Sequence, residues 1–137
     1  MADNVTAAGS KFPKSRRLLK HLDFQRVYQN GRRQFTGNVT VFYLRREGPE
    51  SGTEPRIGLT VGKVLGGSVE RNRMRRRMRE AVRVCIPACQ GPVDIVFNPR
   101  KGVLTLPFAA LVDEVARALQ VPRTAISMIE NGQRKVG

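Results

Sequence analysis

The densest chemistry in this sequence is a run of arginines between positions 71 and 79. Six arginines occupy these nine positions. A guanidinium group binds phosphate oxygens through two parallel N–H donors, and it keeps its charge at any physiological pH. The run is therefore a candidate phosphate-binding surface. The residues that could bind phosphate are Arg71, Arg73, Arg75, Arg76 and Arg79.

Asn72 stands inside this run and has a different chemistry. Its amide offers both a donor and an acceptor, so it can read a base edge or brace the neighbouring loop. The sequence leaves both roles open. For the run as a whole, the alternative is an ordinary solvated helix face, although solvated faces usually mix charges of both signs.

The chain offers little for acid–base or metal chemistry. Its one histidine, His21, has no second imidazole as a partner, and its carboxylates are scattered, whereas two-metal phosphodiester cleavage needs clustered ones. Cys85 and Cys89 lack nearby metal ligands, and residues 58–67 lack the spacing of a Walker phosphate loop. We therefore predict no catalytic residue, no metal ligand and no small-molecule substrate site in the protein.

The bulk composition points to a polyanionic partner. The 137 residues carry a net charge of +14, and 40% of them are hydrophobic, which supports one folded domain rather than a disordered basic tail. Nucleic acid is the leading partner class, and an anionic membrane surface is the competitor. No run of apolar residues is long enough for a membrane span, and residues 1–10 lack the apolar core of a secretion signal. We expect a cytoplasmic protein.

A helix must position the arginines, because apolar residues recur among them at spacings of three and four. Ser68 is its predicted N-cap, and Pro87 ends it or kinks its last turn. Like charges this close destabilise an isolated helix by a few tenths of a kcal/mol per pair, so the helix needs its buried stripe. The stripe comprises Met74, Met78, Ala81, Val82, Cys85 and Ile86.

Further helices and strands flank this helix. Asp23 is the predicted N-cap of a short helix over residues 24–30, which Gly31 closes. Alternation of apolar residues predicts strands, and an amphipathic pattern predicts a last helix with Phe108 on its inner side. The predicted strands span residues 39–45, 56–63 and 93–97, and the last helix spans residues 107–120. The order predicts an α+β sandwich, and a parallel β–α–β unit would normally cross right-handed.

Three segments, in this order, resemble the protein subunit of bacterial ribonuclease P. The most diagnostic is residues 56–83, with a strand ending in Gly-Lys, a glycine, Val-x-Arg-Asn-Arg and a basic helix. Residues 17–31 are similar to the family's first helix, and residues 93–100 to its last strand. The resemblance covers residues 12–120, which leaves residues 1–11 as a disordered tail and residues 121–137 as a C-terminal extension.

The resemblance implies a two-layer α-β sandwich in the order αβββαβα, with a left-handed β–α–β crossover. It also implies a protein that binds a catalytic RNA and the single-stranded 5′ leader of precursor tRNA. The RNA, with Mg2+ bound mainly to itself, would then cut the leader away. By the same resemblance Lys63, Asn72, Arg76 and Arg79 face the leader or the catalytic RNA.

A second surface is implied at a cleft between the sheet and the first helix. Phe24, Tyr28 and Phe42 lie on the family's leader-binding positions. Bases stack on aromatic rings for about 1–3 kcal/mol each, with little demand on sequence. The sequence alone favours a core position for Phe24 and Phe42, and the resemblance makes the core and leader-binding interpretations equal for both.

The sequence departs from the family pattern at a few positions, and it leaves two other functions open. Val64 stands where a second lysine is common, Gly67 where asparagine is common, and Arg77 where the helix is usually apolar. A ribosomal type of RNA-binding protein would explain the charge. A DNA-binding regulator could use residues 121–135, which look like half of a helix-turn-helix, although its other helices are missing.

Overall fold

The computed structural model describes residues 17, 20–48, 52, 54–88 and 91–120. The predicted N-terminal tail, the C-terminal extension and Cys89 lie outside the described residues. The main elements, in chain order, are α1 (His21–Asn30), β1 (Arg32–Phe35), β2 (Val39–Arg45), β3 (Arg56–Leu59), α2 (Ser68–Cys85), β4 (Val93–Pro99) and α3 (Phe108–Ala118). Short 3-10 turns cover Lys63–Leu65, Ile86–Ala88 and Lys101–Leu104. Among the described helices, none is both long and apolar enough to cross a membrane.

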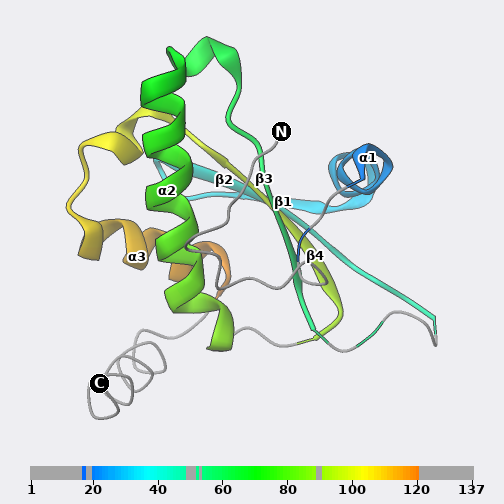
Figure 1. The fold of residues 1–137 in the computed structure, drawn as a ribbon. Helices are drawn as coiled ribbons and strands as arrows, with labels where there is room; N and C mark the ends of the chain where they lie inside the picture. The colour runs from blue at the N-terminus through cyan, green and yellow to red at the C-terminus, as the bar shows by residue number, and fades with distance from the viewer. Residues whose placement is uncertain (1–16, 18–19, 49–51, 53, 89–90, 121–137) are drawn as a thin grey trace.

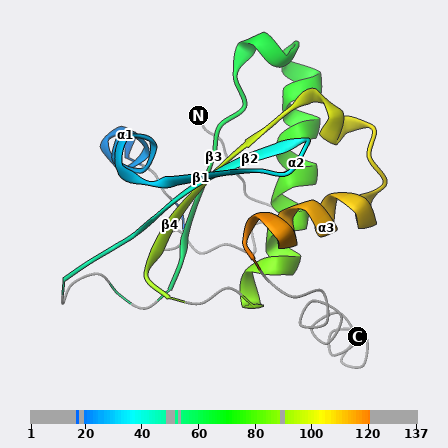
Figure 2. The ribbon, with the colours of Figure 1, turned by 180° about the vertical axis from the view of Figure 1, so that it is seen from behind.

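One four-stranded sheet separates the helices into two layers. Its strand order is β1-β2-β4-β3, so β2 and β4 are central, and only the β3–β4 pair is parallel. The helix α1 crosses one face, whereas α2 and α3 cover the other (Figures 1 and 2). The predicted order αβββαβα is confirmed.

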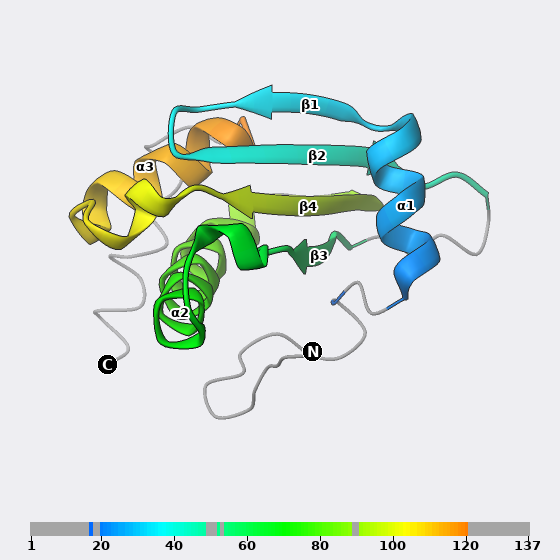
Figure 3. The same cartoon turned by 90° about the horizontal axis from the view of Figure 1, so that it is seen from above.

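The parallel pair is joined through α2, and this crossover is left-handed. Figure 3 views the sheet from the α1 side, with β3 and β4 both pointing left. The chain leaves β3, passes behind the sheet through α2 and returns one strand further up as β4. The general preference for right-handed crossovers would have been misleading here, and the family resemblance gave the correct hand.

The main core lies between the sheet and the layer of α2 and α3. Alternate residues of the central strands point into it, with Phe97 and Ile95 of β4 fully or almost fully buried. Every residue of the predicted apolar stripe on α2 is buried, so that prediction is confirmed. On the opposite face, Val27 of α1 and Val96 of β4 form a smaller cluster, with Phe24, Phe42 and Leu44 packed around it.

Both predicted N-caps are wrong. The helix α1 begins at His21 with Lys20 at the capping position, and the Asp23 carboxylate lies in the first turn, where it pairs with Arg26 at 3.1 Å. The helix α2 begins at Ser68, with Gly67 at the capping position. There Glu70 Oε1 accepts a hydrogen bond from the Gly67 N–H at 3.1 Å. The side chain of the third helical residue thus satisfies the backbone N–H of the capping residue.

Several other boundaries also differ from the predictions. The strand β3 ends at Leu59 rather than at residue 63. Lys63 already belongs to the 3-10 turn Lys63–Leu65. The strand β4 continues to Pro99, which pairs with Val39 at the end of the ladder. The last helix spans Phe108–Ala118, and Phe108 is 42% exposed rather than facing inward.

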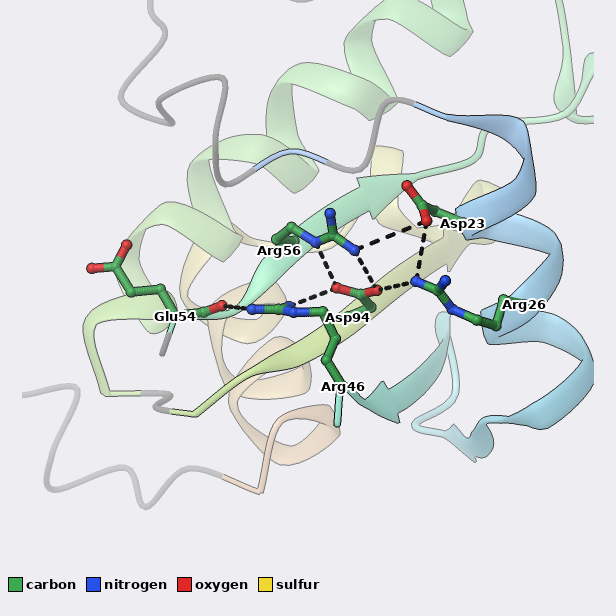
Figure 4. A network of polar contacts seen from close by, with 6 residues as sticks. All are labelled: Asp23, Arg26, Arg46, Glu54, Arg56 and Asp94. Carbon is green, nitrogen blue, oxygen red and sulfur yellow. Dashed lines mark hydrogen bonds and ion pairs between the residues drawn. The ribbon is translucent and has the colours of Figure 1, made fainter. Parts of the chain in front are cut away.

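A buried carboxylate ties four elements together at one end of the α1 face (Figure 4). Asp94 of β4 is completely buried and accepts hydrogen bonds from Arg56 at 2.8 Å and from Arg46 at 2.7 Å. Arg26 of α1 donates to it at 3.2 Å, and Arg46 also donates to the Glu54 carbonyl at 2.6 Å. Burial disfavours the charged carboxylate, but the bonds from Arg56 and Arg46 outweigh it, so the pKa of Asp94 is lowered.

We expect Asp94→Asn to lower the free energy of unfolding by about 3 kcal/mol. This is the low end of the range for breaking a buried ion pair, because the arginines are partly exposed. A lowered pKa stabilises the fold above the unfolded pKa, and that contribution is lost progressively as the pH falls below about 5. Urea unfolding from pH 7 to pH 3 should therefore show a weaker acid dependence in the variant.

The matched control is Glu80→Gln, which removes the surface pair between Glu80 and Arg83 at 3.0 Å. Exposed pairs contribute less than about 1 kcal/mol. Equal urea midpoints for the two variants would contradict a structural role for Asp94.

Candidate nucleic-acid interface

The arginines of α2 divide into exposed and anchored groups. Arg73 and Arg76 are exposed, as is Lys63 in the turn before the helix. Arg71 is half-buried, and its Nε donates to the Gly66 carbonyl at 3.1 Å. Arg71 therefore fixes the loop that enters the helix, while its neighbours remain open to solvent.

Asn72 braces a neighbour within the same helix. Its Oδ1 accepts a hydrogen bond from Arg75 Nη1 at 2.7 Å, one turn further along. Asn72 itself is exposed. In this structure Asn72 therefore braces Arg75 rather than the neighbouring loop.

The entry into α2 depends on a glycine. Gly66 has a φ of 144°, a conformation that residues with a side chain rarely adopt. A Cβ on Gly66 would also collide with the Glu70 carboxylate, which is held against Gly67 N–H. The chain therefore turns sharply before α2, and the Lys63–Leu65 turn contacts the helix.

Like charges crowd on the half-buried part of α2. The pKa of Arg79 is lowered, first by burial and then by the charges of Arg17, Arg75 and Arg76. Burial and the charge of Arg71 also lower the pKa of Arg75. Guanidinium groups stay protonated at physiological pH, so this crowding is an unrelieved repulsion that a bound phosphate would reduce.

Two further arginines lie close to this surface. Arg77, which stands where the family helix is usually apolar, is half-buried and donates to the Leu106 carbonyl, while its buried Nε has no partner among the described residues. Arg17, which was not among the predicted site residues, forms a β-bridge with Ile57 and adds its charge beside Arg79. Only the fold brings Arg17 to α2, so spacing along the chain could not reveal it.

The three predicted leader-binding aromatics lie together where α1 crosses the sheet. The rings of Tyr28 and Phe42 meet edge to face, with their centroids 4.9 Å apart. Phe24 and Phe42 are half-buried against the Val27–Val96 contact, so both also serve as core residues. Tyr28 is 36% exposed and is the most open of the three rings.

The aromatic and basic surfaces are linked by a short stretch of chain. The Tyr28 hydroxyl lies 3.0 Å from Thr60 Oγ1. Thr60 follows β3 directly, and Lys63 comes three residues later. The segment from Thr60 to Lys63 therefore connects the surface at Tyr28 with the turn that precedes α2.

A further aromatic contact lies at the edge strand and was missed from the sequence. The guanidinium of Arg100 stacks over the Phe35 ring at 4.6 Å, and Phe35 is 54% exposed. Phe35 pairs with Thr40 across β1 and β2, so it stands on the α1 face. In the described part of the chain, no three histidine, cysteine or acidic side chains gather closely enough to hold a metal ion.

A small sheet covered by helices, with exposed guanidinium groups at the start of one helix and a half-open aromatic cluster nearby, defines an RNA-binding α-β sandwich. Comparison with known proteins agrees, since the family model for ribonuclease P matches residues 12–122. The chain belongs to the family of ribonuclease P protein components, the RNA-binding subunits of the endoribonuclease that removes the 5′ leader from precursor tRNA.

Individual relatives show the same relationship. The ribonuclease P protein component of Symbiobacterium thermophilum is 38% identical over 74% of this chain and 86% of its own length. That of Desulforapulum autotrophicum is 37% identical over 77% of this chain and 87% of its own. The solved structure of the Staphylococcus aureus protein superposes with a TM-score of 0.67 at 25% identity, covering 78% of this chain and 94% of that one. The Thermotoga maritima structure, at 20% identity, has the same fold, with a TM-score of 0.66 over 77% of this chain and 97% of that one.

We expect Arg73→Ala to weaken binding to a bacterial ribonuclease P RNA and to reduce the salt dependence of that binding. One lost phosphate contact lowers the slope of log K against log salt by about one unit. The measurement is a binding titration at several salt concentrations.

Arg83→Ala is the matched control, because it removes the same charge from the same helix. Arg83 is already paired with Glu80, so its loss should change the slope less. Equal changes for the two variants would mean that total charge, rather than the start of α2, governs binding.

Proposed function

We propose that this chain binds the catalytic RNA through the start of α2 and the single-stranded 5′ leader through the aromatic cluster. The residues assigned to RNA are Lys63, Arg71, Asn72, Arg73, Arg75, Arg76 and Arg79, and those assigned to the leader are Phe24, Tyr28 and Phe42. The domain that does this spans residues 12–120. The observation that carries the proposal is the bond from Tyr28 to Thr60, three residues before Lys63, which joins the two surfaces.

The start of α2 is suited to phosphate because two effects add. The exposed groups of Arg73, Arg76 and Lys63 supply full charges, and the helix begins here with the positive end of its dipole. Arg71 and Asn72 position their neighbours. Arg71 donates a hydrogen bond to the Gly66 carbonyl, and Asn72 accepts one from Arg75. Such neutralisation releases counterions from RNA and is sensitive to salt.

The aromatic cluster suits a leader of variable sequence. Every base has a π-face, so stacking on Tyr28 and on the exposed parts of Phe24 and Phe42 asks little of base identity. The half-buried contacts of the two phenylalanines keep the rings fixed before the leader arrives. Less ordering is then needed on binding, which favours affinity.

The chemical step belongs to the RNA in this proposal. Mg2+ held mainly by the RNA would supply the nucleophile and stabilise the leaving group. The protein holds the leader in place and screens the repulsion between the two RNAs, which should lower the Mg2+ concentration that they need. We infer that it works in the cytoplasm, with precursor tRNA and the catalytic RNA as its partners.

We expect Tyr28→Ala to weaken binding of precursor tRNA to the reconstituted holoenzyme by about 5- to 100-fold, the equivalent of one stacked base. Mature tRNA has no leader and should bind almost unchanged. The measurement compares both affinities for one holoenzyme preparation.

Tyr28→Phe is the control, because it keeps the ring and should retain most of the affinity for a leader of mixed sequence. Urea unfolding of both variants checks that the fold is intact. Equal loss on precursor and mature tRNA would sink the assignment of this surface to the leader.

A further inference from the structure

An exposed stack of a guanidinium on an aromatic ring stands on the edge strand β1, apart from the aromatic cluster. The guanidinium carbon of Arg100 lies 4.6 Å from the centre of the Phe35 ring. Phe35 is 54% exposed, and Arg100 is exposed as well. Phe35 pairs with Thr40, which in turn pairs with Asn98 of β4. The stack therefore lies two strands, or roughly 10 Å, from the residue that contacts Tyr28.

A buried carboxylate holds the turn beside this stack. Glu114 of α3 is only 5% exposed and contacts the turn between β1 and β2. The backbone N–H and the side-chain Nδ2 of Asn38 donate to its two oxygens at 2.9 Å and 2.7 Å, and the Thr36 hydroxyl lies 3.0 Å from Oε1. A buried carboxylate is costly unless it is hydrogen-bonded, and bonds to a charged acceptor are strong. Glu114 therefore fixes the turn to α3.

The same turn fixes both members of the stack. Phe35 is the last residue of β1, directly before the turn. The backbone N–H of Arg100 donates to the Asn38 carbonyl at 2.7 Å. Gly102 packs so closely against the Asn38 amide that a Cβ at this position would collide with Oδ1. Glu114 thus acts on Phe35 through the chain and on Arg100 through Asn38.

The stack has the chemistry of a site for an unpaired nucleotide. Bases stack on aromatic rings and on guanidinium planes. Among the described residues, no carboxylate pairs with Arg100, so its charge is available to a phosphate. Arg33 pairs with Phe42 and is exposed, and Lys101 is exposed next to Arg100 in sequence, so positive charge surrounds the ring. Aromatic rings within positive charge are typical of surfaces that bind single-stranded nucleic acid.

We propose that Phe35 and Arg100 form a second stacking site, which binds one unpaired nucleotide of RNA, and that Glu114 is the positioning residue of this site. The nucleotide belongs either to the catalytic RNA or to the leader beyond the aromatic cluster, and it is bound by the same stacking in both cases. Because the turn is held by a buried carboxylate, the stack is ordered before RNA arrives, which favours affinity. The inference rests on the proposed RNA-binding function and adds a site to it.

The first test is Phe35→Ala, which should weaken binding of one RNA by about 5- to 100-fold, the equivalent of one stacked base. Three affinities are measured: protein for a bacterial ribonuclease P RNA, and holoenzyme at saturating protein for precursor and for mature tRNA. A loss for precursor tRNA alone assigns the nucleotide to the leader, and a loss for the ribonuclease P RNA assigns it to the catalytic RNA. Three unchanged affinities, or an equal loss for the two tRNAs alone, would overturn the inference.

Two further substitutions of Phe35 separate stacking from apolar contact. Phe35→Tyr keeps the ring and should keep the affinity. Phe35→Leu keeps an apolar side chain without the ring and should behave like Phe35→Ala. Full affinity of Phe35→Leu would contradict stacking on this residue. Since Phe35 is exposed, urea midpoints should stay close to that of the unmodified protein.

The role of Glu114 is tested by Glu114→Gln, alone and combined with Phe35→Ala. Positioning predicts that Glu114→Gln weakens binding of the same RNA by about two- to tenfold when the ring is present, and has no effect once the ring is removed. A role in fold stability alone would give the same loss in both backgrounds, and that result would refute positioning. If Glu114→Gln lowers the urea midpoint, Thr36→Val, which removes only one of the three contacts, takes its place in the cycle.

Failure of this inference can be told apart from failure of the proposed function. If Arg73→Ala weakens binding of the catalytic RNA and Tyr28→Ala that of precursor tRNA, while Phe35→Ala changes nothing, the proposed function stands and only the second stacking site is wrong. If all three variants leave every affinity unchanged, the proposed RNA-binding surfaces are wrong and the inference fails with them.

Discussion

The structure depends most on the ion pairs of Asp94, the fully buried carboxylate in a chain with a net charge of +14. Through three arginines it joins the central strand β4 to β3, to the end of β2 and to α1. This fixes how α1 lies across the sheet. Three residues of β4 lie on this face. Asp94 forms the ion pairs, Val96 packs against Val27, and Asn98 accepts a hydrogen bond from Tyr28. Tyr28 contacts this face at Asn98, at the end of β4 opposite to the ion pairs of Asp94.

On the other face of the sheet, packing stabilises the highly charged helix α2. Burial of the apolar stripe against the sheet and α3 offsets the repulsion among the arginines of α2. Burial first, and then the charges of neighbouring arginines, lower the pKa values of Arg75 and Arg79. The helix therefore presents a concentration of positive charge that a bound polyanion would neutralise. The two layers meet through the segment from Thr60 to Gly67, so a leader on one face and an RNA at the helix start can be held together.

The sequence predicted the parts of the fold in which a periodic pattern decides the structure. The strand Val39–Arg45 and the buried stripe from Met74 to Ile86 are as expected. The edge strand β1 escaped detection because its four residues are mostly polar and exposed, so only pairing with β2 makes them a strand. The site divides in the same way. Charge density marked the arginines of α2, but the bridge of Arg17 to Ile57 and the contact of Tyr28 with Asn98 join residues far apart in the chain, which no local pattern contains.

We propose that this protein lets a catalytic RNA cleave precursor tRNA by holding both RNAs on one basic and aromatic surface. The most direct test of this proposal is cleavage at low Mg2+ by a bacterial ribonuclease P RNA, with and without the protein. We expect strong stimulation, with the cut at the mature 5′ end of the tRNA. An RNA whose rate and Mg2+ requirement do not change when it is saturated with this protein would contradict it.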